Sequence, residues 1–526
     1  MRADAPHAVV IGSGIGGAAA TLLLAHAGIP VTLLEKNRRI GGSCSGYEKQ
    51  GFRIDIGTHM FCRGPVGPLG DVLRRVGAGS AVEFRRSYDI AELRMLDHGS
   101  ERLRRIPVPA EVHRMPRFGW ELARALRLGP RDAARALKLL AHILTMSEEE
   151  VAAWDDRTVE QFISPFLDHA PTIALFGLLL GLYFILPYWE VSAGEALWSF
   201  RRMVRDNWLS YPVGGSIAIP AAYCRLAAQR GAEILTGTGV RRVAVEGGRV
   251  RGVELDDGTF LPASIVVSTS SLRTTVFRLV GAQHFPESYV ARVQKIRGSY
   301  IAVQAKIALR KKLVDAGALV GGVGEEVDFL RVTSADMKTM FRAVTEGRIP
   351  PIVPFYCPVP TNFDPSLAPP GCQLLTVCSV APTSDVKLHD PGPAWEEAML
   401  RTMRRVVPGL DENLLFIDRF SVDFIEKWIG KEFGPAVSTG QTPDQVGARR
   451  PPVWTPLGGL YLAGCGAGGR GVGTELAAAS AIECAGRILS DLGRQLAPAR
   501  SPRPLALATS ALARAAVRPL AWATRA

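Results

Sequence analysis

The hydrophobic pattern is most continuous over residues 9–36, which read VVIGSGIGGAAATLLLAHAGIPVTLLEK. A β-branched run at 9–11 is followed by a glycine-rich turn, an alanine- and leucine-rich run to His26, and a second apolar run that ends at Glu35. This order predicts a strand, a helix that Gly28 ends, and a second strand. A signal peptide or a membrane-spanning helix would not carry this glycine pattern, so a buried βαβ unit is favoured over a membrane anchor.

The turn inside this unit, GSGIGG, has the spacing of a dinucleotide-binding loop. Gly12 permits the tight turn, Gly14 lets the backbone approach a pyrophosphate, and Gly17 lets helix and strand pack closely. The helix N-terminus behind the loop offers unpaired N–H groups to the phosphates. Glu35, about 20 residues further on, is placed to accept the ribose hydroxyls. A nucleotide site is the favoured interpretation, and a plain buried βαβ unit is the alternative.

The next segment, residues 36–61, reads KNRRIGGSCSGYEKQGFRIDIGTHMF. The pair Gly41-Gly42 follows the second strand, and the run at 46–56 predicts a short hairpin that ends at Asp55. A nicotinamide dehydrogenase has no need of a second glycine pair here. The arrangement is similar to that of glutathione-reductase-like flavoproteins, in which such a pair lays backbone along the pyrophosphate and the flavin. We therefore predict FAD as the bound nucleotide.

Two later segments return to the same domain. Residues 207–270 predict a helix that Gly231 ends and a β-meander with glycine turns at 247–248 and 257–258. Residues 456–489 predict a strand, a glycine loop and a helix whose N-terminus points its dipole at the flavin. We expect an α/β fold, a glutathione-reductase-like FAD-binding Rossmann domain with an interleaved α+β substrate domain. The FAD-binding domain is assigned residues 1–100, 205–290 and 450–493, the substrate or membrane-facing domain 101–204 and 291–449, and a basic C-terminal tail 494–526.

Charge and cysteine content narrow the choice of partner and compartment. The 526 residues include 62 Lys and Arg against 50 Asp and Glu, which gives a net charge of +12. No nucleic-acid recognition module accompanies this charge, so an anionic membrane surface is expected rather than nucleic acid. The eight cysteines are scattered without a CxxC pair or Cys/His ligand spacing, which argues against a zinc site and a disulfide framework. We predict no metal and a cytoplasmic protein that is peripherally associated with the membrane.

A second apolar run, APTIALFGLLLGLYFILPYW at residues 170–189, carries no charged side chain. Pro171 and Pro187 bracket it, which disfavours a transmembrane span. A buried helix that lines an apolar tunnel is one interpretation, and an ordinary core helix is the other.

Two basic segments lie before and after this apolar run in the sequence. Residues 102–138 combine arginine with Phe118 and Trp120, as in an interfacial helix on anionic lipid, although a solvated surface helix fits equally well. Residues 494–526 contain no acid at all. They predict either a second interfacial helix or a disordered basic tail.

Several separated motifs together resemble one family. GGSCSGYEKQGFRIDIG begins at Gly41, and YPVGG, FDPSLAPPGCQLL and GCGAGG follow at 211–215, 363–375 and 464–469. Over residues 7–492 the sequence is similar to the phytoene desaturase, carotenoid isomerase and retinol saturase branch of the FAD-dependent, amine-oxidase-like superfamily. It departs from relatives at two positions. Ser43 stands where amine oxidases have an arginine, and Cys465 stands where many relatives have an acid.

The resemblance implies an FAD-dependent oxidoreductase that acts on C–C and C=C bonds of a lipophilic isoprenoid, such as a polyene, by hydride transfer to flavin N5. A carotenoid cis-trans isomerase and a retinol-saturase-like reductase stay open, as does a lipid-binding chaperone resembling Rab GDP-dissociation inhibitors. The missing arginine and the apolar run disfavour an amine oxidase. The implied cofactor-binding residues are Gly12, Gly14, Gly16, Gly17, Glu35, Lys36, Gly41, Gly42, Ser43, Val240, Gly464, Gly466, Val472 and Gly473.

Two residues are candidates for catalytic proton transfer. His59 follows the Asp55-Ile56-Gly57 turn near the expected flavin face, and its alternative is a hydrogen-bonded turn histidine. Glu475 opens the final helix, and its alternative is favourable electrostatics at a helix N-terminus.

Overall fold

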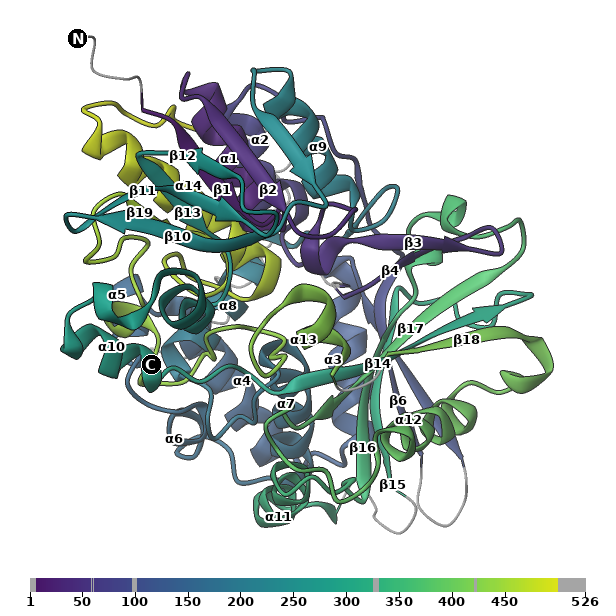
Figure 1. Ribbon diagram of the computed structural model, residues 1–526. Helices are drawn as coiled ribbons and strands as arrows, with labels where there is room; N and C mark the ends of the chain where they lie inside the picture. Colours follow the sequence, from purple (N-terminus) through teal and green to yellow (C-terminus); the bar gives the residue numbers. More distant parts are fainter. Residues whose placement is uncertain are drawn as a thin grey trace.

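The fold is described from a computed structural model, which covers residues 6–57, 59, 61–96, 102–324, 331–420 and 423–499. The first of its two large sheets has five parallel strands in the order β19-β13-β1-β2-β9 (Figure 1). These strands are β1 (Ala8–Ile11), β2 (Val31–Glu35), β9 (Glu233–Thr236), β13 (Ile265–Ser268) and β19 (Leu460–Leu462). Strands from three distant parts of the sequence thus form one sheet, as the Rossmann prediction requires.

Both faces of this sheet are buried, which explains why β1 is apolar throughout. Ala8 and Val10 pack against α1 (Ile15–His26), α9 (Ala218–Ala228) and α14 (Gly473–Asp491). Val9 and Ile11 face the opposite way, toward the meander of β10 (Val240–Glu246), β11 (Arg249–Leu255) and β12 (Phe260–Pro262). Because side chains alternate along a strand, a strand that is covered on both sides shows no polar alternation.

The second sheet has seven strands in the order β18-β14-β17-β16-β15-β6-β7, and β15 with β6 is its one parallel pair. The strands are β6 (Asp89–Leu96), β7 (Leu103–Pro109), β14 (Ile301–Leu309), β15 (Ala318–Gly324), β16 (Ile352–Pro358), β17 (Gln373–Ala381) and β18 (Leu414–Phe420). The predicted domain boundary at residue 100 is wrong, because it separates β6 from its hairpin partner β7. The basic segment 102–138 likewise begins with a strand and not with a helix.

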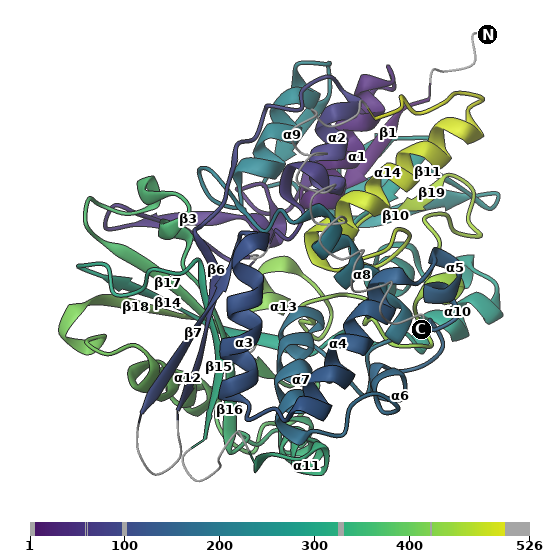
Figure 2. The same ribbon diagram turned by 180° about the vertical axis from the view of Figure 1, so that it is seen from behind.

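Helices cover the two faces of the second sheet differently. The odd-numbered residues of β14, from Ile301 to Leu309, pack against α12 (Gly392–Val406). On the other side, Leu175 and Leu178 of α7 (Ala170–Phe184) join a cluster with β6, β7 and α3 (Met115–Ala125) (Figures 1 and 2). The remaining helices of four residues or more are α2 (Pro68–Arg75), α4 (Pro130–Thr145), α5 (Glu148–Ala152), α6 (Val159–Ile163), α8 (Ala193–Asp206), α10 (Glu287–Gln294), α11 (Ser334–Thr345), α13 (Phe424–Ile429) and the π-helical turn Thr274–Val280.

The apolar run 170–189 forms α7, which ends before Pro187 with Ile185 in the left-handed conformation. Among the described residues, none of the helices combines the length and the apolar character that crossing a bilayer would need. Most of the predicted C-terminal tail, from residue 500 onward, lies outside the described residues.

A hairpin joins the two sheets. Strands β3 (Gly46–Lys49) and β4 (Phe52–Asp55) form the predicted hairpin, and Tyr47 and Lys49 donate to Asp418 on β18. Its last residue, Asp55, is buried and accepts hydrogen bonds from Tyr211 Oη and from the backbone N–H of Ser216. Tyr211 lies on β8 (Tyr211–Pro212), which pairs with β5 (Phe84–Arg85).

We expect Tyr211→Phe to lower the free energy of unfolding by about 1–3 kcal/mol, because the buried Asp55 carboxyl loses a donor. Tyr289→Phe is the matched control, since the Tyr289 hydroxyl is buried and has no hydrogen-bond partner among the described residues. Urea unfolding of the two variants checks the difference. Equal stability of both variants would contradict the anchoring role of Asp55.

Candidate functional site

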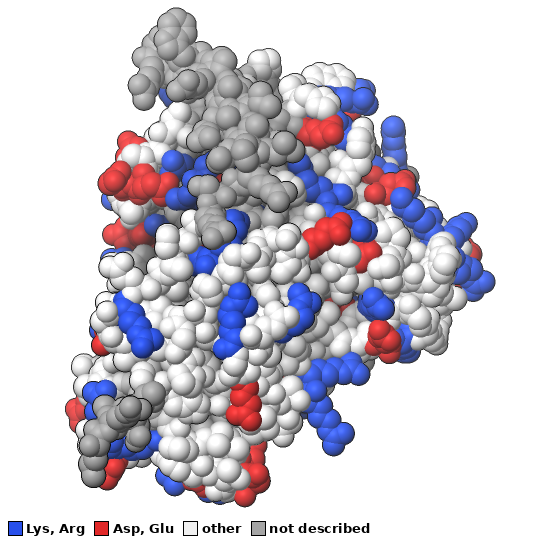
Figure 3. Space-filling view, turned by 90° about the horizontal axis from the view of Figure 1, so that it is seen from above, with Lys and Arg blue, Asp and Glu red and all other residues white. Residues whose placement is uncertain are grey.

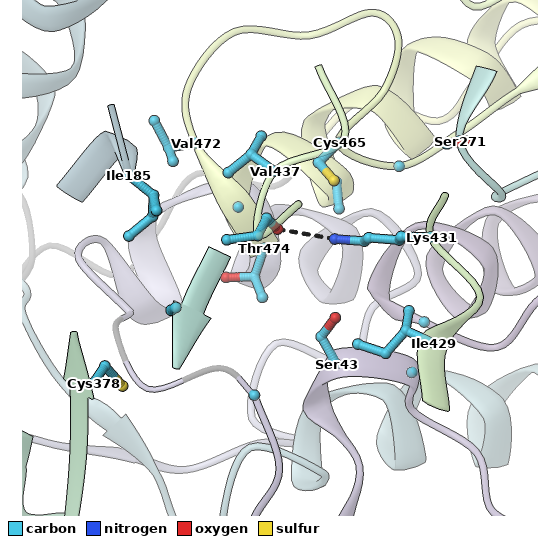
Figure 4. Close-up of a pocket in the computed structure, with 18 of the residues that line it drawn as sticks. Ser43, Ile185, Ser271, Cys378, Ile429, Lys431, Val437, Cys465, Val472 and Thr474 are labelled. Carbon is cyan, nitrogen blue, oxygen red and sulfur yellow. Dashed lines mark hydrogen bonds between the residues drawn. The ribbon is translucent and has the colours of Figure 1, made fainter. Parts of the chain in front are cut away.

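A single cavity of about 860 Å³ extends from the first sheet to the second. At one end it is lined by the glycine loops that follow β1 and β2. At the other end it is lined by α7, α11 and β16. Figure 4 shows the central part, where residues from α13, from the loop after β19 and from the start of α14 point toward one another. The carboxyl ends of parallel strands therefore open directly into the space beside the second sheet.

At the nucleotide end, Glu35 is held by three donors. Its Oε2 accepts from the backbone N–H of Ser13 at 3.0 Å and from the Ser13 hydroxyl at 2.7 Å, and its Oε1 accepts from the Asn37 N–H at 2.9 Å. The Ser13 hydroxyl also accepts from the N–H of Gly41 at 3.0 Å. Ser13 thus fixes the acid at the end of β2 and ties the first glycine loop to the second.

The glycine loops approach one another at backbone distance. A Cβ on Gly16 would lie 2.8 Å from Cα of Gly464, and one on Gly42 would lie 3.2 Å from Cα of Gly14. A Cβ on Gly17 would overlap the carbonyl oxygen of Gly12, which itself has φ +96°. By contrast, a Cβ on Gly14 would meet no atom within 4 Å. The open space beside Gly14 lies where the loop spacing predicts the pyrophosphate, so the residues present fit a dinucleotide.

Most of the cofactor-binding residues predicted from the sequence line this cavity. They are Gly12, Gly14, Gly16, Glu35, Lys36, Gly41, Gly42, Ser43, Val240, Gly464, Val472 and Gly473. Gly17 and Gly466 do not line it. Gly17 packs helix against strand, and the carbonyl oxygen of Gly466 accepts from the Thr439 hydroxyl at 2.9 Å. The individual cofactor contacts stay predictions.

The glycine loop before α14 has an anchor that the sequence did not reveal. Glu195 on α8 is fully buried and accepts from the N–H of Gly471 at 2.6 Å. Arg470 and Arg450 lie 3.3 Å and 3.6 Å from its other oxygen. No local pattern marks Glu195, because its partners are more than 250 residues away.

Glu475, the first of the two catalytic candidates, lines the cavity in the first turn of α14. It accepts from the backbone N–H of Arg63 at 2.7 Å, and the Arg63 guanidinium binds Asp206 at 2.6 Å. Burial raises the pKa of Glu475 to about 7, and Arg63 opposes the shift only in part. Burial therefore outweighs the helix-terminus electrostatics expected from the sequence.

His59, the second candidate, is buried and lines the cavity between the hairpin and β14. Its Nε2 lies 2.9 Å from Lys306 Nζ and 3.3 Å from Gln304 Oε1. Burial and then the neighbouring Lys306 hold the pKa of His59 well below its ordinary value. Gln304 and Lys306 were missed from the sequence, where they appear as two isolated polar positions in an apolar strand.

The other end of the cavity is apolar. Gly177, Leu178, Gly181 and Leu182 of α7 line it, together with Met337 and Phe341 of α11 and Ile352 and Pro354 of β16. The prediction that the run 170–189 lines an apolar cavity is confirmed.

A parallel sheet with glycine loops at its carboxyl edge, joined to an apolar chamber, is typical of FAD-dependent oxidoreductases. The chain matches the family of flavin-containing amine oxidoreductases over residues 15–489 and belongs to it. It is therefore an FAD-dependent oxidoreductase, and its sequence relatives place it in the carotenoid desaturase and isomerase branch.

Three comparisons illustrate this placement. The zeta-carotene-forming phytoene desaturase of Myxococcus xanthus is 26% identical over 482 residues, which cover 84% of this chain and 86% of that protein. The chloroplastic prolycopene isomerase of Daucus carota is 22% identical over 514 residues, covering 92% of this chain and 80% of that protein. The solved structure of an oxidoreductase from Methanosarcina mazei superimposes with a TM-score of 0.68 at 22% identity, covering 90% of this chain and 98% of that one.

We expect Gly14→Ala and Gly17→Ala to fail in different ways. Gly14→Ala keeps the stability of the apoprotein but lowers the FAD content, because its methyl group projects into the open space of the loop. Gly17→Ala lowers stability itself, since the methyl group overlaps the Gly12 carbonyl. Thermal unfolding and the ratio of flavin to protein absorbance measure the two effects. Full FAD content in Gly14→Ala would contradict a pyrophosphate at this loop.

The raised pKa of Glu475 predicts a specific pH dependence. Because the folded protein holds this proton more tightly than the unfolded chain, stability falls as pH rises from about 4.5 to 7. Glu475→Gln removes about 3 kcal/mol of that fall, since each tenfold difference in proton affinity corresponds to about 1.4 kcal/mol. Urea unfolding at pH 5 and pH 8 measures it. An unchanged difference between the two pH values in the variant would refute the buried, proton-holding state of Glu475.

Proposed function

We propose that this protein desaturates a lipophilic isoprenoid at the surface of a membrane. The continuity of the cavity carries the proposal, since one chamber joins the glycine loops to the apolar walls of α7, α11 and β16. An apolar wall positions a long hydrocarbon by burial alone and excludes water from the reacting carbon atoms. The names of the phytoene desaturases among the sequence relatives support the same substrate class.

The reaction removes a hydride from an allylic C–H and a proton from the adjacent carbon. Bound FAD supplies the two-electron acceptor at N5, and an external oxidant later takes these electrons away. We assign the proton to Glu475, which lines the cavity and has a pKa of about 7, close to the pH at which a general base works best. Arg63 holds the Glu475 carboxyl in place through its backbone N–H.

The membrane surface is assigned to α3 and α4. The side chains of Trp120 and Leu137 are 62% and 52% exposed, and basic residues flank them. The exposed cations are Arg117, Arg124, Arg127, Arg131 and Lys138. The opposite side of α3 packs on β7 and shares a hydrophobic cluster with α7, the helix that lines the cavity (Figure 2). A protein that docks through this surface would bring the apolar chamber close to the bilayer.

Another face of the molecule carries charges of both signs. On the face seen in Figure 3, Lys and Arg alternate with Asp and Glu across broad uncharged areas. The combination of exposed aromatic, aliphatic and basic side chains on α3 and α4 therefore carries the docking proposal, rather than the net charge of the whole chain. A cytoplasmic protein bound peripherally to the membrane is the corresponding location.

The function is tested by anaerobic addition of liposomes that carry phytoene or a poly-cis carotene to the purified flavoprotein. We expect the flavin absorption to bleach while longer-wavelength polyene bands grow. A polyene shift that requires pre-reduced flavin would instead indicate an isomerase or a reductase. A protein that binds no flavin after reconstitution would contradict the enzyme and favour a lipid-binding chaperone.

In the same assay, Gly181→Phe tests whether the substrate occupies the apolar end of the cavity. Gly181 lines the cavity, so we expect its phenyl group to reduce turnover at least tenfold while flavin content is unchanged. Leu179→Phe is the matched control, because Leu179 lies on the same helix, is 41% exposed and does not line the cavity. Equal turnover of the two variants would place the substrate elsewhere.

Vesicle flotation tests the docking surface. We expect the double variant Trp120→Ala, Leu137→Ala to bind anionic vesicles at least tenfold more weakly, because it loses the two most exposed large apolar side chains of α3 and α4. Trp454→Ala, which removes another exposed tryptophan beside Arg487, serves as the control. Binding should also weaken as salt is added. Equal binding of both variants would rule out α3 and α4 as the contact.

A further inference from the structure

A buried polar cluster interrupts the apolar wall of the cavity and has no role in the proposed chemistry. It consists of His59, Gln304 and Lys306. Along β14, Ala302, Gln304 and Lys306 share the face opposite α12, because the odd-numbered residues pack on that helix. Ala302, Gln304 and His59 line the cavity, and Lys306 lies directly behind them.

Lys306 is fully buried and makes no ion pair with a carboxylate in the part of the chain that the structure describes. Its Nζ lies 2.9 Å from Gln304 Oε1 and 2.9 Å from His59 Nε2. A lysine ammonium has donors and no acceptor. It therefore forces Gln304 Oε1 and His59 Nε2 to act as acceptors.

Because Lys306 can only donate, it determines which atoms of His59 and Gln304 donate hydrogen bonds and which accept them. With Nε2 as acceptor, neutral His59 carries its proton on Nδ1, and Nδ1 has no hydrogen-bond partner among the described residues. With Oε1 turned to Lys306, the NH₂ group of Gln304 is the free end of the amide, and no hydrogen bond of the described residues uses it. Two cavity-lining side chains thus keep unused N–H donors.

The cluster lies on the sheet side of the cavity. Gln304 is the cross-strand partner of Cys378 on β17. In Figure 4, Cys378 lies well away from Ser271, Ile429 and Lys431. Gln304 therefore lies beside β17, whereas His59 follows Gly57, whose N–H donates to the carbonyl oxygen of Ser43 at 3.1 Å.

We propose that the His59–Gln304–Lys306 cluster binds the oxygen of a carbonyl or carboxylate group on the isoprenoid, so that the preferred substrate is an oxygenated isoprenoid rather than a pure hydrocarbon. The inference rests on the proposed function and narrows its substrate class. A hydrocarbon would leave both buried donors unpaired, which disfavours its binding relative to a ligand that accepts from them.

The charge that orients the cluster is itself titratable. Asp55, Cys357 and Cys378 face Lys306, and its cross-strand partner Asp418 is already bound by Tyr47 and Lys49. Burial lowers the pKa of Lys306 to about 8. Above that pH the neutral Lys306 amine can also accept a hydrogen bond. His59 and Gln304 then no longer have to turn their N–H groups away from Lys306, and the preference for the oxygenated ligand should decline.

The test compares two ligands that share one skeleton. Apo-8′-carotenal and the hydrocarbon that carries a methyl group in place of its aldehyde are titrated into the flavoprotein in one detergent, with protein fluorescence as the readout. We expect the aldehyde to bind about tenfold more tightly at pH 7, the effect of two added hydrogen bonds.

Lys306→Met removes the orienting charge. His59 can then donate from Nε2 to Gln304 Oε1, which leaves Nδ1 as an acceptor. We expect the tenfold preference to fall to about threefold in this variant, because the Gln304 NH₂ group still donates and only the His59 donor is lost, and to keep its full size in Thr376→Val. Thr376 is the buried cross-strand partner of Lys306 on β17 and does not line the cavity. Because partition into detergent is common to all variants, the change in the ratio isolates the protein contribution.

Three outcomes would overturn the proposal. Equal affinity of the wild type for the two ligands overturns it without any variant. A preference that stays tenfold in Lys306→Met overturns the role of Lys306 in orienting the cluster. If Lys306→Met shifts the flavin reduction potential but leaves the ratio of the aldehyde and hydrocarbon affinities unchanged, the cluster acts on the flavin and not on the substrate. A failed desaturation assay with an intact tenfold preference would refute the reaction and leave the binding site standing, so the two proposals fail separately.

Discussion

The close approach of three glycine loops is the constraint on which the rest of the structure depends. The first loop packs closely on the other two, since a Cβ on Gly16 would lie 2.8 Å from Cα of Gly464 and one on Gly42 would lie 3.2 Å from Cα of Gly14. The first two loops are close in the sequence, but the third lies hundreds of residues further on, so the five-stranded sheet must bring β19 to β1 and β2 before the nucleotide end can form. The second sheet and its helices are inserted between these segments, which explains why the domains are interleaved.

Buried acids hold the glycine loops and the β3–β4 hairpin in place. Glu35 holds the first two loops through Ser13, Glu195 holds the third loop through the Gly471 N–H, and Asp55 ties the hairpin to β8. Glu195 and Asp55 accept from donors more than 150 residues away, and Glu35 accepts from Ser13, 22 residues away, as well as from its neighbour Asn37. A buried acid is costly without such partners, so these contacts favour one arrangement of the loops over looser ones. The cavity owes its shape to this small set of long-range hydrogen bonds.

Local patterns predicted what local interactions determine. The βαβ unit, the hairpin at 46–56, the meander and the helix after the last glycine loop all follow from glycine spacing and strand alternation. The boundary at residue 100 failed because β6 is defined by its pairing with β15, which lies more than 200 residues away. Glu195 and Lys306 escaped for the same reason, since a single charge in an apolar stretch shows no partner until the fold supplies one.

The two ionisable groups beside the substrate chamber show how the fold adapts to a lipophilic ligand. Burial raises the pKa of Glu475 to about 7 and lowers that of Lys306 to about 8. Both shifts favour the uncharged form, because a dry apolar chamber penalises an acid and a base alike. Each group is nevertheless held by hydrogen bonds, Glu475 by the Arg63 N–H and Lys306 by Gln304 and His59. The chamber can therefore accept an apolar chain and still present one group able to take a proton and one cluster able to donate hydrogen bonds.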